Sequence, residues 1–192
     1  MKKVTFADVR SLHDYELARD ELRPKILATK ALRRVAVGDH LTVLFENHDT
    51  VLYQIQEMLR AERITHPDAI HHEIDTYNEL VGDKDELRAT LLIEYSDPAE
   101  RDARLRDLVG IEKHVRLEVD GAGSCAAEFD MRQIDEKRVS SVHYVRFPLG
   151  AKLAAAVRSG VPIEIVIDHP EMKARGRSTA QQTAALAADL SD

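Results

Sequence analysis

The spacing of apolar residues along the chain changes near residue 83. Before that point apolar residues recur every three or four positions, which predicts amphipathic helices over residues 1–82. After it, apolar and polar residues alternate in short runs, which predicts a sheet-rich part over residues 83–170. Together the patterns predict a single α+β domain, with N-terminal helices packed on a mainly antiparallel sheet. Residues 171–192 are Ala-rich, and their weak periodicity leaves open whether they form a docked helix or a mobile tail.

The first helical region carries a start signal and an interruption. Thr5 and Asp8 have the spacing of a capping box, which predicts a short first turn of helix. Pro24 lies inside the helical pattern that follows, and a proline removes a backbone hydrogen bond and clashes with the preceding turn. We therefore expect either two helices or one helix that is kinked near Leu22.

The stretch Val43–Leu80 concentrates the clearest periodicity and the polar chemistry of the chain. It predicts a strand that runs into two helices, the first capped by Asn47 or Asp49 and the second by Thr65 with Asp68. The connection between these helices is short, so they should pack as a helical hairpin. The apolar stripes expected to be buried are Val51, Leu52, Ile55, Met58 and Leu59 in the first helix and Ile70, Ile74, Tyr77 and Val81 in the second.

The second half of the chain repeats one order of elements twice. Strand, helix and strand are predicted over residues 87–95, 98–109 and 115–119, and again over residues 142–147, 149–158 and 163–168. This order predicts a ferredoxin-like C-terminal half made of two strand–helix–strand units. A short strand near residues 127–129 and a polar loop over residues 131–140 are expected between the units.

Composition narrows the functional classes. The 192 residues carry a formal net charge of −7, which argues against extended nucleic-acid binding, because phosphate neutralisation needs a basic face. A local basic run is either a solvated helix face or an anion site; its members are Arg23, Lys25, Lys30, Arg33 and Arg34.

Cysteine content and hydropathy exclude further classes of site and location. Cys125 is the only cysteine, so an intramolecular disulfide and a cysteine-based zinc or iron–sulfur site are excluded. The first residues lack the apolar run of a signal peptide, and no segment approaches the ~20 apolar residues that span a membrane. We therefore expect a cytoplasmic protein.

Four polar residues of the predicted hairpin form a candidate metal site. His71 and Asp75 are four positions apart and His72 and Asp75 three apart, so both pairs can meet on one helix face. An imidazole and a carboxylate at this spacing can bind a divalent metal, with Glu57 from the first helix as a third ligand. The set lacks the paired Glu-x-x-His of di-iron bundles and the His-Glu-x-x-His of zinc proteases. The competing interpretation is structural: His71 borders the core and hydrogen-bonds to Asp75 or Asn78, while His72 is solvated.

Other polar residues border the apolar faces of the hairpin. His48 beside Asp49 is either a proton-transfer pair or an ordinary helix start. The remaining members are more typical of groups that lock a hairpin by hydrogen bonds than of catalysts. The full set of pocket or interface candidates is Glu46, His48, Gln54, Arg60, Glu73 and Asn78.

A second candidate pocket involves the strand predicted over residues 142–147. His143, Tyr144 and Arg146 can line it together with Glu128. Neighbouring side chains of a strand point to opposite faces, so this hypothesis competes with one in which one face of the strand lies in water.

Three strings, LFENHDTVLYQIQEMLRAERI, HHEIDTYNEL and VHYVRFP, together resemble an uncharacterised bacterial family, domain of unknown function 3501. The resemblance runs from the N-terminus to about Pro170 and leaves out the Ala-rich tail. It departs at His48, which corresponds to arginine in the family, so a proton-transfer role for His48 would not extend to the family. The resemblance implies no established activity, but it implies genes beside a rubrerythrin-like peroxidase and an iron–sulfur oxidoreductase. It therefore suggests a link to oxidative-stress or electron-transfer machinery.

The sequence supports three functional hypotheses from different classes. The first is an accessory protein that docks on the oxidoreductase or the peroxidase through the polar hairpin surface. The second is a metal-binding protein or metalloenzyme that uses His71, His72, Asp75 and Glu57. The third is a nucleotide- or anion-binding regulator that uses the basic run. A homo-oligomer is compatible with each of them, and no motif specifies a reaction.

Overall fold

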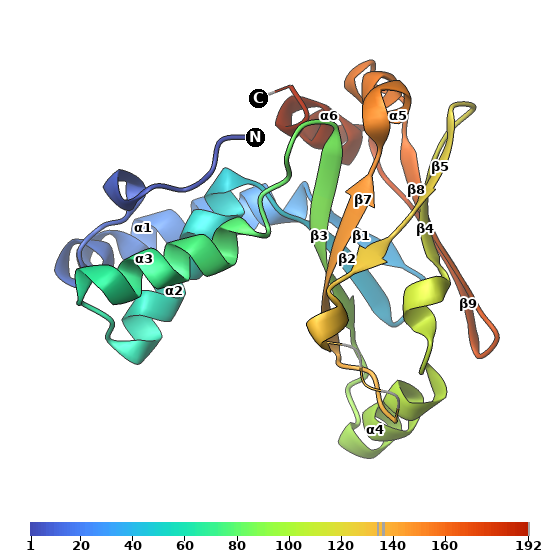
Figure 1. Ribbon diagram of the computed structural model, residues 1–192, viewed down its shortest axis with the longest axis horizontal. Helices are drawn as coiled ribbons and strands as arrows, with labels where there is room; N and C mark the ends of the chain where they lie inside the picture. Colours follow the sequence, from blue (N-terminus) through green and yellow to red (C-terminus); the bar gives the residue numbers. More distant parts are fainter. Residues whose placement is uncertain (134, 136, 192) are drawn as a thin grey trace.

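The computed structural model describes residues 1–133, 135 and 137–191, and it shows a helical arm beside a body made of two sheets (Figure 1). The helices, with η for a single 3-10 turn, are η1 (Phe6–Asp8), α1 (Leu12–Ala31), α2 (His48–Glu62), α3 (Pro67–Asn78), α4 (Pro98–Asp107), η2 (Ile111–Lys113), η3 (Met131–Gln133), α5 (Gly150–Arg158) and α6 (Ala180–Asp189). The strands are β1 (Arg34–Val37), β2 (Leu41–Phe45), β3 (Glu86–Ile93), β4 (Val115–Val119), β5 (Gly123–Ala126), β6 (Glu128–Phe129), β7 (Val142–Pro148), β8 (Ile163–His169) and β9 (Met172–Arg177). The predicted α+β class is confirmed.

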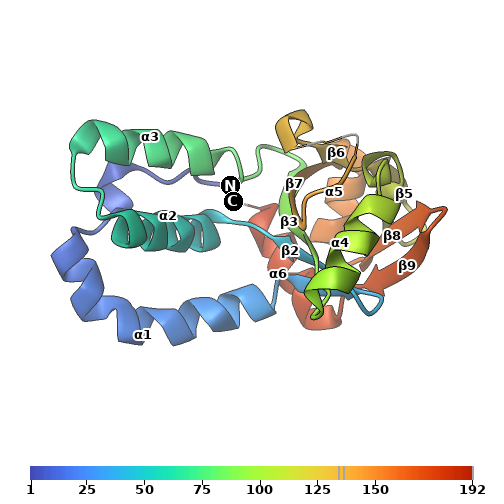
Figure 2. The same ribbon diagram turned by 90° about the horizontal axis from the view of Figure 1, so that it is seen from below.

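The arm consists of α1, α2 and α3, with α2 in contact with both neighbours (Figure 2). Its helices begin largely at the predicted signals. Asn47 caps α2, and Pro67 occupies the first turn of α3, although His66 and not Thr65 precedes that helix. For the first helical region we expected either two helices or one kinked helix. The structure has a single helix, α1, and Pro24 lies inside it.

The body consists of two antiparallel sheets. One sheet has the order β1-β2-β3-β7-β6 and the other has the order β5-β4-β8-β9. Their inner faces meet in one apolar core, and α4 closes one end of the body while α5 and α6 close the other (Figure 1). The alternation that predicted β3 and β7 is therefore the alternation between this core and the opposite, outer face of the five-stranded sheet.

Both predicted strand–helix–strand units are present, but each one crosses between the sheets. The first strand of each unit, β3 or β7, belongs to the five-stranded sheet, and the last, β4 or β8, belongs to the four-stranded sheet. The single-sheet ferredoxin-like arrangement therefore does not form. The physical reason is that strand alternation records which side of a strand is buried and does not record which strand lies beside it.

The Ala-rich tail is ordered over residues 171–191, and its helix docks as one of the two alternatives expected. Residues 172–177 form β9, an element that the sequence did not predict, and α6 packs on α5. Gly176 of β9 lies against β1, where a Cβ atom would collide with the Ala36 carbonyl oxygen, so glycine permits this close approach. The two ends of the described chain lie near each other (Figures 1 and 2).

Arm and body have separate apolar clusters. The arm cluster contains Val4, Val51, Ile55, Leu59, Ile74, Leu80 and Val81, and Tyr144 of β7 packs against it from the body. The base of the arm thus joins the outer face of the five-stranded sheet. Within the predicted loop 131–140, residues 131–133 form η3, while positions 134 and 136 lie outside the described residues. Among the described helices, none is long and apolar enough to cross a membrane.

Candidate functional site

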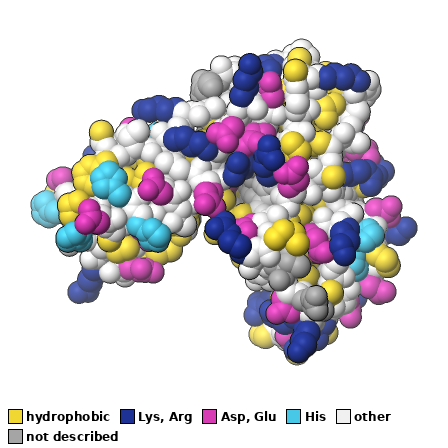
Figure 3. Space-filling view, in the orientation of Figure 1, with side chains coloured by type: hydrophobic (Ala, Val, Ile, Leu, Met, Phe, Trp, Pro, Cys, Tyr) yellow, Lys and Arg dark blue, Asp and Glu magenta, His cyan; other side chains and the backbone are white. Residues whose placement is uncertain are grey.

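A cleft of about 390 Å³ lies between the C-terminal end of α3 and the outer face of the five-stranded sheet. Figure 3 shows charged side chains gathered where the arm meets the body, beside the hollow between them. We call this the arm–sheet cleft, and its lining residues are Thr76, Tyr77, Glu79, Leu80, Arg88, Glu128, Phe129, Asp130, Arg132, Tyr144, Val145 and Arg146. Its volume is within the usual range of ligand-binding pockets.

Two arginines face each other across the floor of the cleft. Arg88 of β3 and Arg146 of β7 are direct partners in the strand register. Like charges at such a position repel each other, so the pair needs compensating carboxylates. Arg88 donates to one oxygen of Glu86 at 2.9 Å, and Arg146 donates to the other at 2.5 Å. Arg146 also donates to Glu128 at 2.7 Å, so both guanidinium groups are held in fixed positions.

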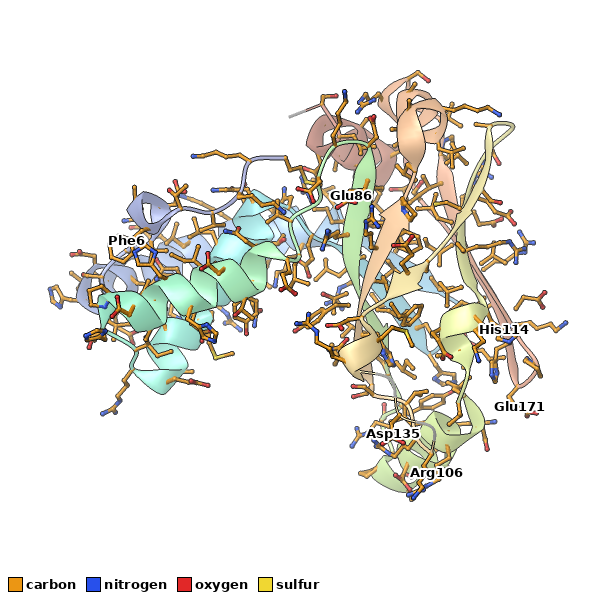
Figure 4. All side chains as sticks on the ribbon, in the orientation of Figure 1. Phe6, Glu86, Arg106, His114, Asp135 and Glu171 are labelled. Atoms are coloured by element: carbon orange, nitrogen blue, oxygen red, sulfur yellow. The ribbon has the colours of Figure 1, made fainter. Side chains whose placement is uncertain are left out.

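Glu86 is the central acceptor of this network. Its side chain is only 4% exposed, and it lies at the junction of arm and body (Figure 4). Burial by itself raises the pKa of a carboxyl group, but hydrogen bonds from the Asp83 amide, Arg146 and Arg88 outweigh burial and lower the pKa of Glu86 to about 2. Glu86 is therefore ionised at neutral pH and acts as an anchor.

Arg132 closes the mouth of the cleft. It donates to Glu79 at the end of the arm at 2.7 Å and also to Asp130 of the body. The Arg132 side chain is 73% exposed, so an incoming partner can compete for these contacts. Because hydrogen bonding to Arg132 lowers the pKa of Asp130, that carboxylate stays charged at neutral pH.

Two tyrosines supply the apolar part of the cleft. Tyr77 of α3 and Tyr144 of β7 are both half-buried, and burial raises the pKa of each hydroxyl group. Both hydroxyls therefore remain protonated at neutral pH and can donate hydrogen bonds. Arginine and tyrosine side chains thus line one cavity, an arrangement suited to binding a segment with carbonyl or carboxylate acceptors.

The structure does not bring the four candidate metal ligands together. Glu57 faces α1, where its carboxylate accepts hydrogen bonds from Tyr15 at 2.7 Å and from Arg19 at 2.8 Å. His71, His72 and Asp75 are all exposed, and the His71 ring stacks on Phe6 with ring centroids 4.8 Å apart. Among the described residues, no group of three or more His, Cys, Asp or Glu side chains is arranged to hold a metal ion. Helical spacing within the hairpin could not show that α1 covers the side of α2 that carries Glu57.

The structural interpretation predicted that His71 borders the core and hydrogen-bonds to Asp75 or Asn78, but His71 is exposed in the structure. The His71 ring stacks on Phe6, and the Asn78 side chain binds the N-terminal segment and not His71. The Asn78 side-chain oxygen accepts from the Val4 amide at 2.8 Å, and its nitrogen donates to the Val4 carbonyl at 2.8 Å. Asn78 therefore fixes the N-terminal segment on α3.

The other hairpin candidates mostly have structural partners. Glu46 is buried and accepts from Thr90 at 2.8 Å, and Arg60 pairs with Glu16 of α1 at 2.6 Å. Gln54 and Glu73 are half-buried on their helices. None of these four residues lines the arm–sheet cleft.

His48 lies at the start of α2 between two carboxylates. Its Nδ1 atom is 3.1 Å from Asp49, and its Nε2 atom is 3.7 Å from Asp8. A helix N-terminus favours carboxylates, and both aspartates lie at the start of a helix or turn. This placement fits the interpretation of His48 and Asp49 as an ordinary helix start.

The basic run does not form one patch. Arg33 is buried and makes a bidentate pair with Asp189 of α6, with both distances at 2.8 Å. Asn47 donates to the same carboxylate at 3.1 Å, so this contact joins the ends of α1, α2 and α6. Lys30 lies 5.2 Å from the centre of the Tyr53 ring. Three exposed cations, Arg23, Lys25 and Arg34, remain.

The second candidate pocket, predicted around the strand over residues 142–147, overlaps the arm–sheet cleft in part. Tyr144, Arg146 and Glu128 line it, whereas His143 points to the other face of β7 and is fully buried. Sequence reasoning missed Arg88, because the partner strand of β7 was unknown. The available signal was the polar alternation of Glu86, Arg88 and Thr90 along one side of β3.

The comparisons with known proteins define a family. The chain belongs to the DUF3501 family, described as a protein of unknown function, which matches residues 3–190 and so includes the tail that the resemblance left out. A crystal structure from Burkholderia pseudomallei K96243, described as a novel protein of unknown function, is 38% identical. It superposes with a TM-score of 0.92 and covers 98% of this chain and 100% of that chain. No curated protein matches the chain.

Proposed function

We propose that this chain is an accessory protein that binds a partner protein in the arm–sheet cleft. The observation that carries the proposal is the cleft itself, which has one wall from the helical hairpin and one from the sheet. Its arginines are held by carboxylates and its tyrosines are protonated, so it can donate hydrogen bonds from fixed positions. Preformed donors lower the entropic cost of binding, which favours recognition of an extended acceptor-rich segment.

The resemblance to the family suggests who the partner is. Genes of this family are expected beside an iron–sulfur oxidoreductase and a rubrerythrin-like peroxidase, and both are candidates for the bound protein. The proposal therefore links the chain to an oxidative-stress or electron-transfer system in the cytoplasm. This link rests on analogy, whereas the binding surface rests on the residues of the cleft.

Calorimetric titration of the purified chain with each of the two candidate partners tests the proposal. We expect one of them to bind, and we expect Arg132→Glu to weaken that binding by roughly tenfold or more, because charge reversal at the cleft mouth repels the acceptors. Arg106→Glu is the matched control, since Arg106 is also an exposed arginine paired with an aspartate but lies on α4, away from the cleft (Figure 4). It should change the affinity by less than about twofold.

Two results would overturn the proposal. One is the absence of binding heat with both partners at high micromolar concentration. The other is an equal loss of affinity in the Arg132 and Arg106 variants, which would place the contact surface elsewhere. A thermal melt of each variant confirms that the fold is intact before titration, because both side chains are exposed and surface changes cost little stability.

A further inference from the structure

A second cavity lies within the arm, between α1, α2 and the segment that precedes α1. We call it the arm cavity. Its volume is about 280 Å³, close to the lower end of the range for ligand pockets, and none of its described lining residues lines the arm–sheet cleft. Pro24 lies between two of its lining residues, Leu22 and Lys25, and a proline removes a hydrogen bond and bends a helix. Figure 2 shows α1 following a curved path beside α2, and the cavity occupies space between the two helices.

One part of the arm cavity is apolar. Leu22 and Ile26 of α1 line it together with Leu52 and Tyr53 of α2. Ile26 is buried, but Leu22, Leu52 and Tyr53 are only half-buried. The two helices therefore leave apolar surface that they do not cover for each other. A hydrocarbon group bound in the cavity would remove this surface from water, which favours binding.

Two cations, Arg10 and Lys25, also line the arm cavity. In the part of the chain that the structure describes, both form hydrogen bonds only through their backbones. The Arg10 amide donates to the side chain of Gln56 at 2.7 Å, and the Lys25 carbonyl accepts from Thr29 at 3.2 Å. Gln56 is buried and also donates to the Arg10 carbonyl at 3.3 Å, so it fixes the position of Arg10 beside the cavity. The guanidinium and ammonium groups are left to pair with an added anion.

The two carboxylates that line the same cavity already have partners. Asp8 accepts from the Thr5 amide at 2.8 Å and from the Thr5 hydroxyl at 2.7 Å, and it lies 3.5 Å from the Lys2 ammonium group. Asp49 lies 3.1 Å from the Nδ1 atom of His48. These contacts engage the carboxylates but leave the two cations unpaired, so the arm cavity is complementary to a small anion.

From the apolar wall and the two cations we infer that the arm cavity binds a small monocarboxylate with a hydrocarbon chain or ring. The carboxylate pairs with Arg10 and Lys25 through charge-assisted hydrogen bonds, and the hydrocarbon part covers the half-buried apolar side chains. A ligand that has only the charge, or only the hydrocarbon, makes half of these contacts. The site is separate from the arm–sheet cleft, so it does not depend on the partner proposed for that cleft.

Calorimetric titration of the full chain with octanoate near neutral pH tests this inference. We expect a dissociation constant on the order of 0.1–1 mM, as for a small ligand of this size. Octylammonium has the same chain and the opposite charge, and acetate has the same charge and no chain. Each should bind at least about tenfold more weakly than octanoate. No binding of octanoate at about 10 mM, or equally tight binding of octylammonium or acetate, would overturn the inference.

Variants on α1 locate the binding site. Lys25→Gln should weaken octanoate binding by about fivefold or more, because it removes a charged partner of the carboxylate. Arg23→Gln is the matched control, since Arg23 is an exposed cation two positions away that does not line the cavity, and it should change the affinity by less than about twofold. Equal losses in these two variants would overturn the inference, because they would place the ligand outside the cavity.

A second pair of variants tests the apolar wall. Leu22→Gln should weaken octanoate binding by about fivefold or more, because it replaces apolar surface of the cavity with a polar group. Leu17→Gln is its control: Leu17 is 73% exposed on the same helix and does not line the cavity. A thermal melt of each variant without ligand confirms that the fold is intact. Since Lys25 is exposed, Lys25→Gln keeps the test decisive even if Leu22→Gln unfolds the arm.

Discussion

The arm and the body differ in how many apolar side chains they bury. The arm buries seven apolar side chains in its cluster, whereas the body buries twenty-nine in one core among the described residues. The arm also has specific polar contacts between its segments: Glu57 with Tyr15 and Arg19, Arg60 with Glu16, and the Gln56 side chain with the Arg10 backbone amide. The body is therefore stabilised mainly by its large apolar core, whereas the position of the arm depends on a few named polar side chains.

The largest expected effect comes from truncating the centre of the body. Phe147 is fully buried and its ring lies 6.0 Å from that of Phe45, so Phe147→Ala should cost about 3–5 kcal/mol of global stability. Urea unfolding followed by circular dichroism measures it. Leu59→Ala in the arm should cost less, because a small cluster can collapse around the gap. Equal losses in the two variants would contradict the contrast between arm and body.

The next effect concerns the joint between the two regions. Asp189→Ala leaves Arg33 buried without its carboxylate, which should cost about 3 kcal/mol. Asp189→Asn keeps an acceptor for Asn47 and Arg33 and should cost less. Thermal unfolding of both variants measures the difference. A cost for Asp189→Ala within the noise of surface substitutions would mean that the pair does not hold the joint.

A smaller and local effect is expected inside the arm. Glu57→Gln removes the charge that binds Arg19 and should cost about 1 kcal/mol. Hydrogen exchange should speed up in α1 and α2 and remain unchanged in β3 and β7. Glu16→Gln is the matched control, because its pair with Arg60 is more than half exposed on the Glu16 side and contributes little. Faster exchange across the body would show that arm and body open together.

The smallest expected effects concern how the stability of the chain depends on pH, through His143 in the body and Glu57 in the arm. Burial lowers the pKa of His143 in the body below 6.5, so the unfolded chain takes up this proton first and stability falls as the pH drops below 6.5. In the arm, hydrogen bonds from Arg19 lower the pKa of Glu57 from 4.5 to about 2, so its contribution is complete above pH 4.5 and is lost toward pH 2. The free energy of unfolding, measured against pH, should therefore have a shallower slope between pH 6.5 and 5 in His143→Phe. An unchanged slope would show that His143 does not contribute to the pH dependence of stability.

The elements of the chain could be predicted better than their assembly. Periodicity and caps located α2, α4, β3 and β7, because these signals depend on neighbours within a few residues. The strand β9 was missed, since Met172–Arg177 carries alternating charges and a glycine and has no apolar run. Its pairing is set by β8 and by the close approach to β1, which are contacts between distant parts of the chain.

The candidate site shows the same limit. Alternation indicated that Tyr144 and Arg146 share one face of β7, and that part was correct. The partner arginine on β3 depends on strand register, and the wall from α3 depends on how the arm meets the sheet. The four candidate metal ligands do not come together for a related reason. Helical spacing relates residues on one helix, but it does not show that Glu57 binds Arg19 of α1.

The pair between Arg33 and Asp189 also sets the order in which a newly made molecule can mature. The two residues are 156 positions apart, and ribosomes add roughly 5–20 residues per second. Roughly 8–30 s therefore pass between the synthesis of Arg33 and that of its carboxylate partner. During translation α1 and α2 can form, but the contact that joins their ends to α6 cannot close until the last helix emerges. The angle of the arm is thus fixed late, after the chain has almost left the ribosome.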